Sequence, residues 1–190
     1  MKMLLIPALI STAHSATILT EFEALGHGSV LPTNPYSFPT VTVTVASNGK
    51  SDRGLIVNTD EPLAADPDLH VNAGWAIGIS EKGEPDDEAK GGTITFKFEA
   101  PLDSLAYNMV DVDEGADIIV DGVVISHLTG DQETTGPQLI LFSTPQDTVV
   151  VRFHGSGVIA GVDPQITSIP EPTALAFSTL ALLALLRRRR

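Results

Sequence analysis

The chain has 190 residues, no cysteine and a formal net charge of −13 at pH 7. This length suits a single domain, which must be stabilised by core burial, or by a bound metal, rather than by disulfides. Between residues 17 and 169, six Lys and Arg stand against 23 Asp and Glu, a net charge of −17. Such a surface repels nucleic acid and anionic lipid but is compatible with divalent cations and neutral glycans; the alternative is that the acidity serves solubility alone.

Residues 1–15 have the organisation of an export signal. Lys2 supplies a positive charge, residues 3–13 are uncharged and mostly apolar, and Ala13 and Ser15 are small residues at the two positions that signal peptidase reads. We therefore expect a signal peptide over residues 1–15, cleaved after Ser15. The alternative is an apolar first β-strand, but the positive charge ahead of the run favours the signal.

Residues 16–168 form the predicted ectodomain, and short runs of alternating apolar and polar residues follow one another through it. Gly, Pro, Asn and Asp separate these runs, which is the pattern of β-strands joined by turns. The expected strands are 17–22, 40–45, 55–58, 75–80, 93–100, 105–113, 117–120, 123–128, 138–143 and 148–154. The inward rows expected in three of them are Val41, Val43, Val45; Ile94, Phe96, Phe98; and Val149, Val151, Phe153.

Asp121-Gly122 separates two of the expected strands and suits a two-residue type I′ hairpin, in which both central residues have positive φ. No convincing run of helical period reaches three turns within this part of the chain. The prediction is an all-β fold, an antiparallel β-sandwich of jelly-roll-like form, with an N-terminal signal peptide and a single C-terminal transmembrane helix.

Carboxylates at the end of one expected strand are the first candidates for a metal site. Strand alternation places Asp111 and Asp113 on the same face as Leu105, Tyr107 and Met109, at the end of an inward apolar row. Buried carboxylates need a cation, backbone donors or solvent at the rim of the sandwich. Ca²⁺ suits them because it binds six to eight oxygen ligands.

Further acids in two loops are candidate ligands for the same ion: Asp66 and Asp68, and Asp86 and Asp87. The order of residues after Asp111 is not that of an EF-hand loop. The one cofactor that these residues suggest is a structural Ca²⁺. The alternative is that these acids are solvated side chains of the loops.

The sequence shows no signature of an enzyme, and we expect the protein to have no catalytic activity. The four histidines of the body do not form His-Glu-x-x-His or a two-histidine metal spacing: His27, His70, His127 and His154. Residues 154–157 do not form the Gly-x-Ser-x-Gly turn of hydrolases. An acid pair like that of glycosidases stays open as a third function, because its separation is spatial. Trp75 is either a sugar-stacking residue or, as is commoner for a lone Trp in a β-sandwich, part of the core.

The last 22 residues, 169–190, combine three features in a fixed order. Residues 170–172 read Pro-Glu-Pro, residues 173–186 carry no charge and are mostly apolar, and residues 187–190 are four arginines. A helix over residues 173–186 spans about 21 Å, and counting from residue 169 brings it nearer to the hydrocarbon thickness of about 30 Å. Arginines mark the cytoplasmic side of such a helix. The alternatives are a plain tail anchor and a core helix.

This order resembles the PEP-CTERM sorting signal of exported bacterial proteins. The resemblance implies processing by exosortase, a membrane-embedded cysteine-protease-like enzyme, and delivery to the cell surface or extracellular matrix of a Gram-negative bacterium after transient anchoring in the inner membrane. The sorting motif maps onto Pro170, Glu171 and Pro172, and the membrane stop onto Arg187, Arg188, Arg189 and Arg190.

Residues 66–115 also resemble β-sandwich ectodomains of exported bacterial surface proteins, which implies an adhesive or glycan-associated role. The leading expectation is a non-enzymatic structural or adhesive surface protein, with exosortase and extracellular polysaccharide as partners. The alternative is a Ca²⁺-dependent carbohydrate-binding module on the cell surface.

Overall fold

The structure is a computed structural model that describes residues 22–166. The predicted signal peptide (1–15) and the predicted sorting signal (169–190) lie outside the described residues. Within residues 22–166, no helix has the length and apolar character needed to cross a membrane.

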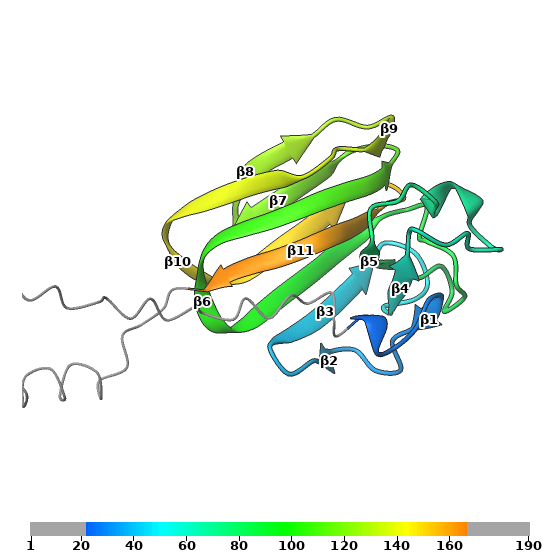
Figure 1. The fold of residues 1–190 in the computed structure, drawn as a ribbon, viewed down its shortest axis with the longest axis horizontal. Helices are drawn as coiled ribbons and strands as arrows, with labels where there is room; N and C mark the ends of the chain where they lie inside the picture. The colour runs from blue at the N-terminus through cyan, green and yellow to red at the C-terminus, as the bar shows by residue number, and fades with distance from the viewer. Residues whose placement is uncertain (1–21, 167–190) are drawn as a thin grey trace, which may run out of the picture. The chain divides into compact units, whose positions relative to one another are not determined.

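Eleven strands and one 3-10 turn make up the regular structure of residues 22–166, and every strand pairing is antiparallel (Figure 1). The predicted all-β, antiparallel fold is therefore confirmed. The elements are β1 (Ser29–Val30), β2 (Tyr36–Ser37), β3 (Val41–Ser47), β4 (Gly54–Asn58), η1 (Pro67–Leu69), β5 (Trp75–Ile79), β6 (Gly92–Val112), β7 (Ala116–Val120), β8 (Val123–Leu128), β9 (Gln132–Thr134), β10 (Gln138–Phe153) and β11 (Val158–Ile166).

Two long strands, β6 and β10, hold the arrangement together because each pairs with different neighbours along its length. Residues 92–98 of β6 pair with β3 and with the C-terminal half of β10, whereas residues 102–110 pair with β11. One side of the sandwich-like fold is therefore β2-β3-β6-β10-β7-β8, and the other is β1-β4-β5-β11-β6 with the N-terminal half of β10.

The sequence predicted two strands where the structure has the single strand β6, and again where it has β10. Pro101 marked the expected break, but the chain continues as a strand through it. Proline cannot donate to a ladder, so it is tolerated where the pairing is already irregular. The register between β6 and β10 shifts at this point, between Leu102 and Lys97.

The main core lies between the two sides of the fold. All nine predicted inward residues of β3, β6 and β10 are buried in it. A second, smaller core cluster is made by β4, β5, β11 and the end of β6 together with the loop between β4 and β5. Leu63 and Leu69 of that loop are buried in the second cluster, and this fixes η1 against the strands.

The predicted hairpin is confirmed. Asp121 and Gly122 join β7 to β8 with φ angles of 51° and 76°, and Val120 pairs with Val123 across them. Positive φ at both central residues is what a type I′ turn requires, and its twist matches that of the flanking strands.

Candidate metal site

The six acids predicted as possible calcium ligands come together at one end of the fold. They belong to three separate stretches: the residues around η1, the turn between β5 and β6, and the end of β6. Carboxylate oxygens of Asp66, Asp86 and Asp87 lie within 4.8 Å of one another. The Asp111 carboxylate interacts electrostatically with those of Asp68 and Asp113, and the Asp87 carboxylate interacts with that of Asp111. We call these six residues the acidic cluster.

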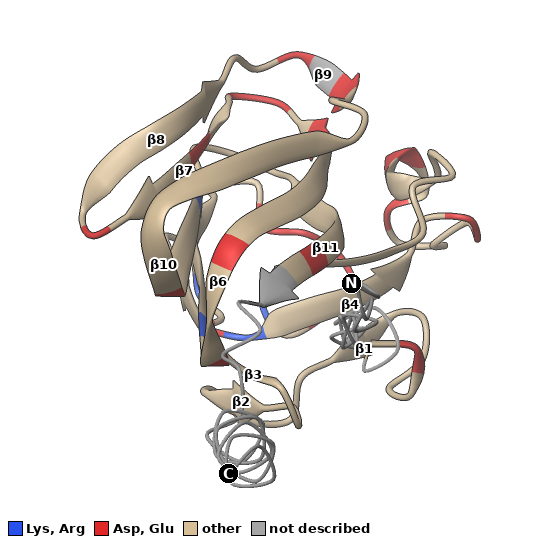
Figure 2. Cartoon of the chain, turned by 60° about the vertical axis from the view of Figure 1, so that its left-hand side comes forward, with Lys and Arg blue, Asp and Glu red and all other residues tan. Residues whose placement is uncertain are grey.

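Within the part of the chain that the structure describes, the acidic cluster has no basic partner. Figure 2 shows how few Lys and Arg positions there are beside the many Asp and Glu. Among residues 22–166, the basic side chains in contact with a carboxylate are Lys82, beside Glu81, and Arg152, His127 and His154, beside Asp117. No Lys, Arg or His of this part of the chain therefore forms an ion pair with the acidic cluster.

Core packing and backbone hydrogen bonds place the first two stretches. Leu69, in the second core cluster, anchors η1 beside Asp66 and Asp68. The turn that carries Asp86 and Asp87 is closed by a bridge between Ser80 and Asp87.

Gly91 ends the turn between β5 and β6, and only glycine fits there. It has a φ of 65°, and a Cβ at this position would lie 2.3 Å from the backbone oxygen of Phe153. The close approach holds the turn against the end of β10, so the acids on the turn are carried by a constrained backbone.

The third stretch departs from the predicted alternation. Asp111 has a φ of 52°, in the left-handed region that Asp tolerates better than most residues. As a result Val112, not Asp111, continues the inward row of Tyr107 and Met109 in the main core. The expectation that Asp111 and Asp113 lie at the end of that inward row is therefore wrong: after the turn in the backbone, Asp111 is half-buried at the rim and Asp113 is exposed.

Backbone N–H groups and the Ser156 hydroxyl donate hydrogen bonds to these carboxylates. The Gly157 N–H donates to Asp87 Oδ2 at 2.6 Å, and the Asp87 N–H donates to Asp66 Oδ2 at 3.4 Å. Ser156 Oγ donates to Asp113 Oδ2 at 2.9 Å. Further hydrogen bonds link Asp66 to Asp68 and Asp111 to Ser156. The remaining carboxylate oxygens are those that water or a cation would contact.

Burial and repulsion between neighbouring carboxylates raise the pKa of Asp66, Asp87 and Asp111. Burial raises the pKa of Asp66, and the adjacent Asp68 carboxyl raises it further. Burial also raises the pKa of Asp87, against the lowering effect of the Gly157 N–H. For Asp111, burial and the charge of Asp68 raise the pKa to about 6. A cation in the cluster would reverse these shifts, because it favours the ionised carboxylates.

The acidic cluster runs from the interior to the surface. Asp66 and Asp87 are buried, with 6% and 8% of their surface exposed. Asp86 and Asp111 are half-buried, and Asp68 and Asp113 are exposed. This gradient suits Ca²⁺ at a rim, where protein oxygens fill one side of its coordination sphere and water the other.

Trp75, the predicted sugar-stacking residue, starts β5. It is half-buried and packs against the main core. The ring is thus a partner of the core, and part of its surface remains accessible.

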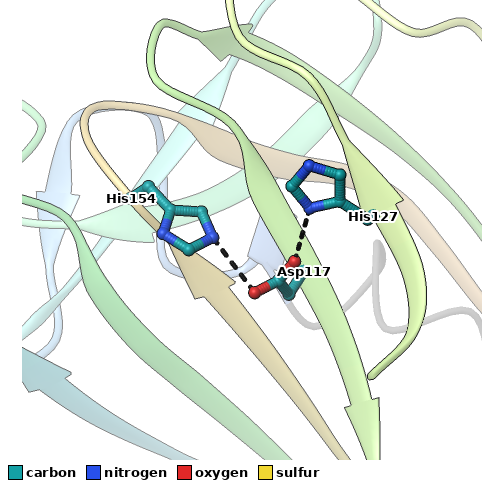
Figure 3. Close-up of side chains that lie close together, drawn as sticks. All are labelled: Asp117, His127 and His154. Atoms are coloured by element: carbon teal, nitrogen blue, oxygen red, sulfur yellow. Dashed lines mark hydrogen bonds and ion pairs between the residues drawn. The ribbon is translucent and has the colours of Figure 1, made fainter.

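A second polar cluster was not predicted: Asp117 of β7, His127 of β8 and His154, which follows β10 (Figure 3). His127 Nδ1 lies 2.7 Å from Asp117 Oδ1, and His154 Nε2 lies 3.0 Å from Asp117 Oδ2. The hydrogen bond with His127, followed by that with His154, holds the pKa of Asp117 below its ordinary value. The spacing of these residues in the sequence gives no sign of the cluster, because only strand pairing brings them together.

Comparison with known proteins adds no assignment. A scan against models of protein families finds none that matches, and a search of curated proteins finds no similar sequence.

Proposed function

We propose that this chain is an exported, non-enzymatic surface or matrix protein whose β-sandwich domain is stabilised by Ca²⁺ at the acidic cluster. The observation that supports the calcium proposal is the convergence of six acids from three stretches of the chain. Two of these acids are buried, and none forms an ion pair with a Lys, Arg or His of residues 22–166.

Calcium would act by joining segments that otherwise repel one another. The ion would bring together η1, the turn before β6 and the end of β6, and it would bind only the folded chain. Such binding stabilises the fold by about 2.7 kcal/mol when free Ca²⁺ is 100 times its dissociation constant. Extracellular calcium modules work with dissociation constants of about 0.1 to 1 mM, so the site need not be tight outside the cell.

The exported location is supported by the sequence. We propose sorting by exosortase through Pro170, Glu171 and Pro172, with the apolar run and the arginines as a transient inner-membrane anchor in a Gram-negative bacterium. The acidic surface of the domain agrees with a setting among neutral polysaccharides. For the fold we propose the jelly-roll-like form, supported by two antiparallel sides that share their longest strands.

Mass spectrometry of the mature protein from its native host tests the sorting proposal, because it determines both ends of the chain. We expect the N-terminus to follow Ser15 and the C-terminus to lie upstream of Arg187. A surface fraction that retains an intact Arg190 would count against sorting.

Thermal unfolding with Ca²⁺ and with a chelator tests the calcium proposal. We expect the midpoint to rise with Ca²⁺ in the wild type, and to rise much less in Asp87→Asn. An unchanged wild-type midpoint in saturating Ca²⁺ would reject a stabilising calcium site.

The second candidate is Ca²⁺-dependent carbohydrate binding, and it is favoured by the accessible part of the Trp75 ring. A glycan array tests it, with Trp75→Ala as the variant and a melting curve to show that the variant folds. Binding that needs both Ca²⁺ and Trp75 would support this role. No binding on any glycan would leave the structural role.

A further inference from the structure

We propose that Asp117, His127 and His154 form a Zn²⁺ site on the outer face of the fold, separate in position and chemistry from the acidic cluster. Two imidazoles and one carboxylate are a ligand set that zinc and its neighbouring transition metals prefer, whereas Ca²⁺ prefers oxygen ligands alone.

Strand pairing places the three side chains on one face of the sheet. Asp117 lies directly opposite His127 in the β7–β8 pairing. On its other side Asp117 pairs with Arg152 of β10, and His154 follows two residues later on the same face of the chain. Phe153, between the last two, is buried in the main core, so Arg152 and His154 point outward.

The ligand atoms are already close to a metal-binding arrangement (Figure 3). One oxygen or nitrogen of each residue lies within 4.8 Å of the others, and the two contacts to Asp117 are 2.7 and 3.0 Å. Atoms bound to one tetrahedral Zn²⁺ at about 2.0 to 2.1 Å are roughly 3.3 Å apart. The contacts to Asp117 use its two different oxygens, so binding one ion requires them to lengthen by about 0.3 to 0.6 Å. It also requires the two ring nitrogens, which lie within 4.8 Å, to be about 3.3 Å apart.

The bonding changes balance without a co-reactant. A neutral imidazole that donates to Asp117 carries its proton on the contacting nitrogen. When zinc takes that nitrogen, the proton moves through solvent to the other ring nitrogen, which both rings can present to water because 61% and 40% of the side chains of His127 and His154 are exposed. Asp117 remains ionised throughout and supplies the negative charge.

The surroundings favour a site with an open coordination position. Asp117 is buried, with 8% of its side chain exposed, and it holds the inner side of the cluster on the rigid pairing of β7 and β8. The two histidines stand between it and solvent. Three protein ligands leave the fourth position of zinc to water or to a ligand from outside the chain.

Arg152 opposes the metal and thereby supplies a diagnostic test. Its Nη1 lies 3.7 Å from Asp117 Oδ2, and 47% of its side chain is exposed, so it has room to swing away. If Asp117 serves only as a hydrogen-bond acceptor, removing Arg152 takes away a favourable partner. If the cluster binds Zn²⁺, removing Arg152 takes away a repulsive charge and strengthens metal binding.

Titration calorimetry of the full chain in detergent micelles with ZnCl₂, in excess Ca²⁺ to occupy the acidic cluster, tests the proposal. We expect one zinc site in the wild type, weakened tenfold or more by His127→Gln and by His154→Gln. Arg152→Gln should bind zinc about three to five times more tightly. The control is His70→Gln, an exposed histidine beyond η1, which should bind as the wild type does.

Cobalt substitution and melting curves keep the outcomes distinct. Co²⁺ should give tetrahedral absorption bands in the wild type that His127→Gln abolishes, while the metal-free variant retains a cooperative unfolding transition. Absence of zinc binding in the wild type would overturn the proposal. It would equally be overturned by binding that survives both histidine substitutions, that is lost in His70→Gln, or that does not strengthen in Arg152→Gln.

Discussion

Replacing Asp111 with Asn should change the stability of the domain in opposite directions with and without calcium. Asn has the shape of Asp but no charge, so the substitution removes one repelling carboxylate and one calcium ligand at the same time. Asp111 suits this test because its charge interacts with the charges of Asp68, Asp87 and Asp113 of the acidic cluster.

The expected gain without calcium follows from the pKa of Asp111. Its rise from 3.8 to about 6 is roughly two pKa units, equivalent to about 3 kcal/mol for a fully buried group. Because Asp111 is half-buried, solvent screening reduces this figure to about 1 kcal/mol. At pH 8 in chelator, Asp111→Asn should therefore be more stable than the wild type by about 1 kcal/mol.

The expected loss with calcium follows from weaker binding. When free Ca²⁺ is 100 times the wild-type dissociation constant, the wild type gains about 2.7 kcal/mol. A tenfold to hundredfold weaker site in Asp111→Asn leaves a gain of about 1.4 to 0.4 kcal/mol at the same Ca²⁺ concentration. The order of stability of the two proteins should thus reverse or nearly reverse.

Urea unfolding at pH 8, in EGTA and in CaCl₂, measures both effects. Trp75 is the single tryptophan of the chain and packs against the main core, so its fluorescence reports the unfolding transition. The matched control is Asp147→Asn, an exposed Asp in the bend of β10, which should show no dependence on calcium. A destabilised Asp111→Asn in EGTA, or an undiminished calcium gain, would refute the reasoning.

Three further predictions test other links between the fold and the acidic cluster. First, in chelator the stability of the wild type relative to Asp111→Asn should fall as pH rises from about 4 to above 6, because the raised pKa of Asp111 means that the folded chain keeps this proton to a higher pH than the unfolded chain does. Urea unfolding at a series of pH values measures this dependence of stability on pH, and Ca²⁺ should reduce it. Second, Gly91→Ala should lower the unfolding free energy by at least about 2 kcal/mol more than Gly136→Ala does. Both glycines have a φ of 65°, but only a Cβ at Gly91 would meet backbone atoms. Equal losses in the two variants would show that the close approach of Gly91 to the backbone does not contribute to stability. Third, Leu69→Ala should lower the unfolding free energy by about 2 to 5 kcal/mol and weaken calcium binding measured by calorimetry. Leu141→Ala should change neither quantity, because 75% of Leu141 is exposed. An unaltered calcium affinity in Leu69→Ala would mean that η1 does not position the acidic cluster.

Much of the fold follows from local sequence patterns, because strand alternation and turn chemistry act over a few residues. The inward rows of β3, β6 and β10 and the hairpin at Asp121-Gly122 are of this kind. The continuity of β6 through Pro101 does not follow from local patterns, because it depends on the strands with which each half of β6 pairs. Sequence also singled out the six acids, but only the packing of Leu69 and the approach of Gly91 bring them together.

Both candidate sites lie where strand alternation breaks, and this explains what sequence could not show. A regular hairpin from Val120 and Val123 would place Asp117 opposite Ser126, whereas the structure has a register shift between Ile118 and Ile119. That one-residue shift brings Asp117 opposite His127 instead.

Without the shift, His127 would pair with Ala116, whose side chain is buried in the main core. The bulge therefore moves the histidine from an inward to an outward position, just as the positive φ of Asp111 moves that carboxylate from the core to the rim. Departures from regular geometry cost stability and are maintained where they place functional groups. The two departures add a geometric reason to test both polar clusters for metal ions.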